Sequence, residues 1–375
     1  MARRLRWLVP LMLLGGCAHH QVEAPHAQPP PPAKAPAAKA TMVYRFEGIE
    51  LFGTRKYTRE ELLAPYLAEL PTAGTLLDME KDGTAFIQAL AKGKETIQSR
   101  HGFALIRNSV TAYAKDMTLR VTVDVVDLGD EWRLEYAPAP TGSVPEPDGL
   151  LAAWSTYLTR MWKLVNTGVI STEDTEPCRA FHCFYGPGHP ELMQLEAPLL
   201  AGVPTHFETL VRMAHTDQDP KKREQAAYLL AYGPSREEVA RALVPLMSDS
   251  NEAPRNAAMR VLWSVQEKAD RPLVPLEKVL RAIHGPLISD RNKAAGLLAA
   301  LVSKDTSQRG LILHETGEVL LEMATAKQVI ERKPALDILR TLSGKDFGED
   351  LASWRAWVQE TRATQPPRAP SPNQR

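Results

Sequence analysis

Two cysteines and two histidines within one short loop are the residues of this chain most suited to chemistry. The segment CRAFHCFYGPGHPEL begins at Cys178 and also contains His182, Cys183 and His189. Thiolates and imidazoles are common ligands of structural zinc, so the four side chains could form one metal site. Alternatively, Cys183 could be a nucleophile assisted by a nearby histidine, or the two cysteines could close a small disulfide loop.

The third cysteine, Cys17, follows an apolar segment near the N-terminus. Arginines precede the apolar residues 7–14, a run about half as long as a membrane-spanning helix, so residues 1–16 are typical of an export signal. The run Leu14-Gly15-Gly16-Cys17 resembles the lipobox of bacterial lipoproteins, which implies cleavage after residue 16 and acylation of the Cys17 thiol. Several acyl chains, at ~0.8 kcal/mol per buried CH₂, give a stable anchor. The alternative is an ordinary secretory signal with a cysteine by chance.

Export of the protein would favour one of these possible states for the other two cysteines, Cys178 and Cys183. Compartments outside the cytoplasm are oxidising, and an even remainder of cysteines favours pairing, so we expect a disulfide between Cys178 and Cys183. Zinc bound by Cys178, His182, Cys183 and His189, and free thiols, are the alternatives.

Residues 17–42 are rich in alanine and proline, a composition typical of an extended tether rather than a core. At ~3.1 Å per residue, such a tether would reach roughly 70 Å from a membrane surface. The expected location is the bacterial cell envelope, with the lipid in the outer membrane and the chain facing the periplasm.

Overall composition limits the remaining chain. About 320 residues follow the tether, enough for two or three domains. The chain has 45 basic and 45 acidic residues, so no basic excess indicates nucleic-acid binding. No second long apolar run follows the signal, so no further membrane-spanning helix is expected.

Residues 43–128 have the pattern of a small α+β domain. A strand is expected over 43–51, followed by a helix that starts with a capping box at Thr58 and Glu61. Asp78 is expected to cap a second helix, and two strands follow over 103–113 and 117–127. In the last strand, aliphatic residues alternate with polar ones from Thr118 to Asp124, which predicts a sheet with one face in water.

This order of strands and helices resembles the POTRA (polypeptide-transport-associated) domain of bacterial envelope proteins. The matching segments are FEGIELFGTRKYTREELL, LLDMEKDGTAFIQAL, HGFALIRNSV and LRVTVDVV. The resemblance implies partner binding, often by the addition of a strand to an exposed sheet edge. An unrelated small α+β module is the alternative.

The middle of the chain is expected to be a linker followed by helices. Residues 137–149 are rich in proline and glycine, which favours a linker, and residues 150–215 form a helical region that carries the cysteine loop. Within it, Trp154 and Trp162 have helical spacing and are expected in the core.

One pattern, Arg-x-x-Ala-x-x-aliphatic-Leu, occurs four times between residues 216 and 360. Its arginines are Arg223, Arg255, Arg291 and Arg332, at spacings of 32, 36 and 41 residues. Loose repeats of this length indicate a helical solenoid. The alanines would allow close approach of helices, and each arginine could bind a carboxylate of a neighbouring loop; the alanines are Ala226, Ala258, Ala294 and Ala335.

The repeats resemble HEAT and HEAT-like repeats, including the subgroup named after phycobilisome lyases. The segment GKDFGEDLASWRAW resembles the cap of such proteins, in which Asp350 would start the last helix and Trp354 and Trp357 would cover the end of the stack. A non-repetitive helical domain is the alternative. Residues 361–375 are expected to be a disordered tail.

The expected architecture is therefore an α+β POTRA-like domain followed by an all-α HEAT-like solenoid. The chain has no Gly-rich phosphate loop, His-Glu-x-x-His motif or nucleophile elbow. We expect a non-enzymatic lipoprotein without a cofactor that acts as a scaffold for proteins of the cell envelope, as an accessory to outer-membrane assembly or organisation. The alternative is an enzyme with a metal or thiol site in the Cys178–His189 loop.

Overall fold

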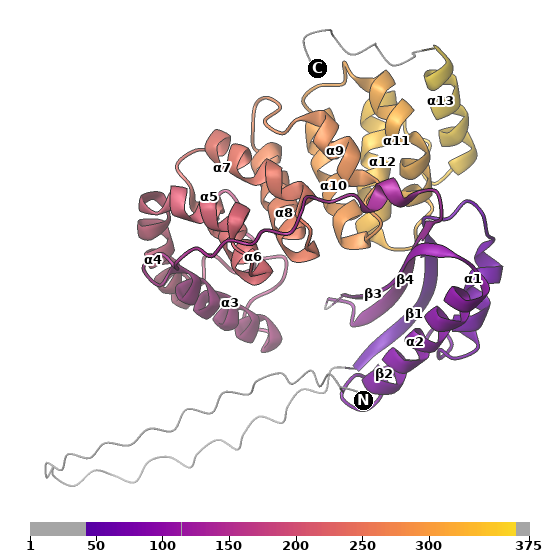
Figure 1. Ribbon diagram of the computed structural model, residues 1–375, viewed down its shortest axis with the longest axis horizontal. Helices are drawn as coiled ribbons and strands as arrows, with labels where there is room; N and C mark the ends of the chain where they lie inside the picture. Colours follow the sequence, from indigo (N-terminus) through magenta and orange to yellow (C-terminus); the bar gives the residue numbers. More distant parts are fainter. Residues whose placement is uncertain (1–42, 114, 365–375) are drawn as a thin grey trace, which may run out of the picture. The chain divides into compact units, whose positions relative to one another are not determined.

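The computed structural model describes residues 43–113 and 115–364, in which a sheet region is followed by helices (Figure 1). The predicted signal, Cys17 and the tether 17–42 lie outside the described residues, as do residues 365–375. The last helix, α13 (Leu351–Thr364), contains the first residues of the predicted tail, so the helix continues beyond the expected end. No helix in the described part of the chain has the length and apolar character needed to cross a membrane.

The sheet region is a four-stranded mixed sheet with two helices. The strands have the spatial order β2-β1-β4-β3, with β1 parallel to β4 and the other neighbours antiparallel. The elements are β1 (Val43–Phe52), α1 (Arg59–Leu67), β2 (Leu76–Asp78), α2 (Gly83–Arg100), β3 (Phe103–Tyr113) and β4 (Thr118–Asp127).

Of the two predicted helix starts in this region, one is confirmed and the other is wrong. Thr58 caps α1, because its hydroxyl accepts a hydrogen bond from the Glu61 N–H. The prediction for Asp78 was wrong: this residue ends the short strand β2, and α2 begins after Asp82. The Asp82 carboxylate accepts the Asp78 N–H at 2.9 Å, so the expected helical turn is instead a tight connection after a strand.

The helical region starts at residue 150. The motif-bearing helices α6, α8, α10 and α12 pack side by side in this order (Figure 1). The helices are α3 (Leu150–Asn166), α4 (Pro190–Thr205), α5 (Phe207–Thr216), α6 (Pro220–Leu229), α7 (Arg236–Leu243), α8 (Glu252–Glu267), α9 (Leu276–Ile283), α10 (Ile288–Val302), α11 (Arg309–Ala324), α12 (Val329–Ser343) and α13.

Two hydrophobic cores hold these regions separately. Side chains of the sheet pack with α1 and α2 around Tyr66 and Leu90, whereas a long core follows the helices from α3 to α13. Among the described residues of the sheet region, Phe52 alone belongs to the helical core. Trp154 is in that core as expected, but Trp162 is 45% exposed, so its predicted core position was wrong. Trp162 lies edge-on to Tyr185 at the surface.

The second face of the sheet is covered by the helical region, contrary to the prediction that it meets water. Thr122 and Asp124 on β4 have no exposed surface. The N-terminal ends of α10 and α12 supply the covering side chains, because Arg291 and Gln328 bind these two residues. The alternation in β4 was correctly predicted, but it separates two buried faces.

The predicted linker, residues 137–149, is part of an extended strap that lies along the helices and is defined here as residues 129–149. It begins with a short 3₁₀ helix (Glu131–Leu134) and crosses the helical region towards α3 (Figure 1). Gly142 exchanges backbone hydrogen bonds with Thr216 and Gln218, and Ala137 donates to the Ser248 carbonyl. Because these polar backbone groups are paired, the strap is part of the fold.

Candidate binding cleft

The predicted disulfide is present: Cys178 and Cys183 are joined, with their Cα atoms 5.6 Å apart. Neither cysteine is therefore a thiol in this structure. The loop that they close is attached to the helices, because the Phe181 N–H donates to the Ala231 carbonyl at 2.9 Å.

The two histidines of this loop lie in different surroundings. His182 is half-buried and packs against Phe184 and Tyr228, and its Nδ1 is 2.9 Å from the Ser264 hydroxyl. Burial lowers the pKa of His182 to about 3, so the ring is neutral. His189 directly precedes α4. Across residues 43–113 and 115–364, no group of three or more His, Cys, Asp and Glu side chains is arranged to hold a metal ion.

The first two motif arginines bind carboxylates of the next unit. Arg223 donates two hydrogen bonds of 2.7 Å to the two carboxylate oxygens of Asp249. Arg255 donates to a single oxygen of Asp290, at 3.0 and 2.7 Å. All four side chains are buried. Such fork-shaped pairs fix the geometry between successive helices.

The third motif arginine joins the helices to the sheet. Arg291 donates to Asp124 on β4 at 2.8 Å and to Glu331 on α12 at 2.8 Å, and all three groups are almost fully buried. Its guanidinium also lies 3.5 Å from the ring centre of Phe52. The fourth, Arg332, differs: it is half-buried and has one long contact of 3.5 Å, to the Ala326 carbonyl.

The predicted alanines and the two tryptophans of the predicted cap are buried, and Asp350 lies at the surface. None of the four alanines has exposed surface. The Asp350 carboxylate accepts the N–H groups of Ala352 and Ser353 at the start of α13. Trp354 is fully buried and packs edge-on against Phe347, and Trp357 is 8% exposed.

Polar groups surround Arg291 and form the junction between the sheet and the helices. Glu50 on β1 accepts the Lys327 N–H at 2.8 Å, and Tyr113 on β3 donates to Gln328 on α12 at 2.9 Å. Glu322 on α11 accepts the Gly53 N–H at 2.8 Å. Gly53 has a φ of +102°, which favours glycine at this turn.

Burial changes the protonation of the junction carboxyls. Desolvation raises the pKa of Asp124 in spite of its bond to Arg291. It also raises the pKa of Glu322, and it raises the pKa of Glu331 to about 7. These carboxyls therefore retain protons at a higher pH than carboxyls in water do.

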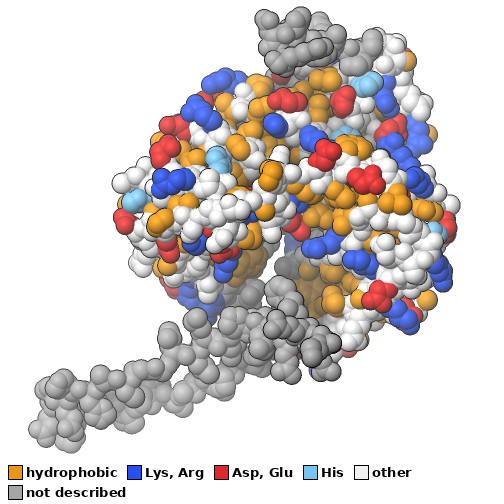
Figure 2. Space-filling view, in the orientation of Figure 1, with side chains coloured by type: hydrophobic (Ala, Val, Ile, Leu, Met, Phe, Trp, Pro, Cys, Tyr) orange, Lys and Arg blue, Asp and Glu red, His pale blue; other side chains and the backbone are white. Residues whose placement is uncertain are grey.

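Beside the junction, a cleft of about 640 Å³ separates β3 from the helices. Its walls are Leu105 and Arg107 on β3, the loop before α8, and Leu134 and Tyr136 of the strap. Figure 2 shows the surface hollowed between the sheet region and the helical region. Two exposed ion pairs cross from the β3 side to the helical region; they join Arg107 to Glu252 and Lys115 to Glu173.

The outer edge of β3 is unpaired. β3 is the last strand in the sheet order, and within the described residues its backbone forms ladder hydrogen bonds with β4 alone. Val110 on this strand is 41% exposed. An edge strand of this kind presents free N–H and C=O groups in a row.

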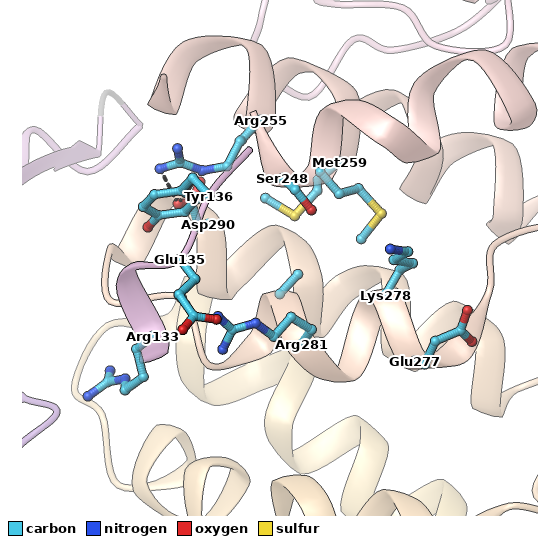
Figure 3. Close-up of a pocket in the computed structure, with 13 residues that line it drawn as sticks. Arg133, Glu135, Tyr136, Ser248, Arg255, Met259, Glu277, Lys278, Arg281 and Asp290 are labelled. Carbon is cyan, nitrogen blue, oxygen red and sulfur yellow. Dashed lines mark hydrogen bonds and ion pairs between the residues drawn. The ribbon is translucent and has the colours of Figure 1, made fainter. Parts of the chain in front are cut away.

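A smaller cavity of about 280 Å³ adjoins the cleft (Figure 3). Tyr136 and Arg255 line both spaces, and the Arg255 guanidinium lies 4.0 Å from the centre of the Tyr136 ring. Figure 3 shows the strap on one side of the cavity and Met259 and Lys278 on the others. The strap thus contributes side chains to both spaces.

Sequence reasoning missed several of these residues. Asp124 was recognised as polar but assigned to water, and Tyr136 was outside every motif. Glu331 carried a usable signal, because it directly precedes Arg332, as Asp290 directly precedes Arg291. An acid before the next motif arginine could have identified the partners of Arg255 and Arg291.

Comparison with known proteins gives no relative from which a function can be transferred. No protein-family model matches the chain, and no curated protein matches it either.

Proposed function

We propose that this protein is a non-enzymatic, lipid-anchored scaffold of the bacterial cell envelope that binds an extended segment of a partner protein along β3. The observation that supports this proposal most directly is the unpaired edge of β3 beside the 640 Å³ cleft. Addition of a strand to such an edge is a recurring mode of peptide recognition.

The chemistry of the cleft indicates how a partner would be selected. Net hydrogen-bond energies are only ~0.5–1.5 kcal/mol each, so the side chains in the cleft would provide much of the specificity. Leu105 and Leu134 provide apolar surface, while Arg107 and Glu252 provide both charges. An extended segment with an apolar side chain flanked by polar ones fits this lining.

Two resemblances support the scaffold assignment. The parallel pairing of β1 with β4, with both long helices between them in sequence, agrees with a POTRA-like sheet. The regular packing of α6, α8, α10 and α12, with arginine–carboxylate pairs between successive units, agrees with a HEAT-like solenoid. Both kinds of domain bind proteins, and a role as an accessory to outer-membrane assembly or organisation is the sharper form of the proposal.

Photo-crosslinking in intact cells tests the β3 edge. A photoreactive amino acid at Val110 should form a covalent adduct with one envelope protein, and the crosslinked residues of that protein should lie in an extended segment. Met193 on α4 is similarly exposed and is the matched control position. Absence of an adduct from Val110, or the same adduct from Met193, would contradict strand addition.

The lipid anchor has a separate test. Cys17→Ala removes the thiol that would be acylated, so the variant should remain uncleaved or become soluble. Mass spectrometry of the N-terminal peptide and extraction of the membrane fraction measure these outcomes. Unchanged cleavage and unchanged membrane association would contradict lipidation at Cys17.

A further inference from the structure

We propose that the junction between the sheet and the helices is a proton-responsive hinge, which holds protons when it is closed and opens as they are released. The proposal is based on the number of buried charges at the junction, on an unpartnered carboxyl oxygen, and on the small apolar contact across it.

Among the buried groups at the junction, carboxyls outnumber cations when every group is ionised. Carboxyls come from four elements: Glu50 on β1, Asp124 on β4, Glu322 on α11 and Glu331 on α12. The buried cations that face them are Arg291 on α10 and Arg133 of the strap. Exposed Arg55, the Tyr113 hydroxyl and Arg120 on β4, which pairs with Glu47, also act on these groups. Because an unpaired buried charge is costly, protonation of a carboxyl stabilises the closed junction.

Glu331 is the carboxyl best suited to hold such a proton. Its Oε1 accepts from Nε of Arg291 at 2.8 Å and lies 2.7 Å from Nη2 in the same ion pair. Its buried Oε2 has no hydrogen-bond partner among the described residues. Ionisation would leave the second oxygen charged and unsolvated, with Asp124 and Glu50 as like charges nearby.

Few apolar contacts oppose opening. The sheet and the helices have separate hydrophobic cores, and Phe52 is the one described side chain of the sheet region in the helical core. Burial of this one phenylalanine opposes opening by an amount similar in size to the effect of one or two shifted proton equilibria. Protonation can therefore change the balance between closed and open states.

The direction of the effect follows from the pKa of Glu331. The ordinary value is 4.5, and burial raises it to about 7 in the closed state. The stabilisation is complete below 4.5 and is lost as the pH rises towards 7, above which this carboxyl is ionised in both states. Opening should thus increase over this interval and then reach a plateau.

The inference has one consequence for the cleft, and this consequence rests on the proposed function. β3 is attached to the junction through Ser109, which donates to Asp124, and through Tyr113. When the junction opens, the cleft beside β3 widens, and a partner strand gains access to the edge.

Hydrogen exchange of the full chain in detergent micelles tests the hinge without any partner. Native protein and Glu331→Gln are compared at the same pH, from about pH 5 to about pH 8, so that intrinsic exchange rates cancel. Glutamine is nearly isosteric with glutamate and cannot ionise. The reporters are the backbone amides that donate across the junction: Gly53 to Glu322, Lys327 to Glu50 and Ile288 to Asp124.

Exchange in the native protein, relative to Glu331→Gln, should rise by at most about tenfold per pH unit for one proton and then level off. Glu318→Gln is the matched control, because Glu318 is an exposed glutamate on α11 that pairs with Arg362, and it should behave as native. Exchange of the backbone amides of α6 reports global unfolding, so the ratio between native protein and Glu331→Gln should not change with pH there. A constant ratio between native protein and Glu331→Gln would overturn the hinge, whatever the crosslinking at Val110 shows.

Discussion

Arg291 and Arg332 occupy the same position in the repeated sequence pattern but have opposite environments. Arg291 is fully buried between two carboxylates, whereas Arg332 is half-buried and binds no carboxylate among the described residues. The difference shows that the arginine motif alone is not the structural unit. The unit is the arginine together with an acid from the following unit.

The other arginines agree with this interpretation. Arg223 binds Asp249 and Arg255 binds Asp290, and each acid lies close in sequence to the next motif arginine. After Arg332, the chain continues into α13, where Asp350 caps the helix instead of binding an arginine. The last arginine therefore lacks the acid that a following unit would supply.

The largest expected effect is the loss of Arg291. Arg291→Met would leave Asp124 and Glu331 buried together without the cation that binds them both, and removal of one partner from a buried pair costs about 3–5 kcal/mol. Urea titration measures this loss of unfolding free energy. If the loss is below about 1 kcal/mol, the buried bridge does not hold the two regions together.

A somewhat smaller effect is expected at Arg255. Asp290 binds it through one oxygen, and the other carboxylate oxygen of Asp290 has no hydrogen-bond partner in the described part of the chain. Arg255→Met should cost about 3 kcal/mol, because Asp290 remains buried and unpaired.

The double variant Arg255→Met/Asp290→Leu is the control for this site. It removes both charges, and replacement of a whole buried pair by apolar groups is often nearly neutral. Greater stability of the double variant than of Arg255→Met would show that the cost comes from the stranded carboxylate. Equal stability would instead indicate loss of packing around the arginine stem.

Removal of the disulfide should have an intermediate effect. The bond between Cys178 and Cys183 closes a loop with a sequence separation of 5. Loop-closure entropy then predicts a loss of about 2 kcal/mol for Cys178→Ser/Cys183→Ser. Urea titration of the double serine variant against native protein measures it, and mass spectrometry of non-reduced peptides checks the bond itself. Two free thiols with stoichiometric zinc in the native protein would restore the metal-site alternative.

The sequence predicted individual elements better than their surroundings. The strand over residues 103–113 has the predicted bounds, and the four motif segments are helices that pack side by side. Alternation in β4 identified which side chains share a face, but periodicity carries no information about what covers that face. The covering residue for Asp124 is Arg291, which is 167 positions away in sequence.

The candidate cleft was not predictable for the same reason. Tyr136 directly precedes the predicted linker 137–149, and composition does not reveal that the backbone of this linker is paired with the helices. The prediction that Asp78 caps a helix was wrong for a different reason, because aspartate both caps helices and stabilises turns. The three-residue strand β2 was too short to give a periodic signal.

The smallest expected effect is at Arg332, and it is the most informative partner to Arg291→Met. Arg332→Met removes a half-buried side chain whose one polar contact is 3.5 Å long, so the unfolding free energy should change by less than about 0.5 kcal/mol. Urea titration in the same buffer gives both values. Near-equal losses for the two variants would mean that packing of the aliphatic part of the arginine side chain provides the stabilisation at both positions. A large difference would show that the stabilisation comes from the ion pairs that Arg291 forms with Asp124 and Glu331.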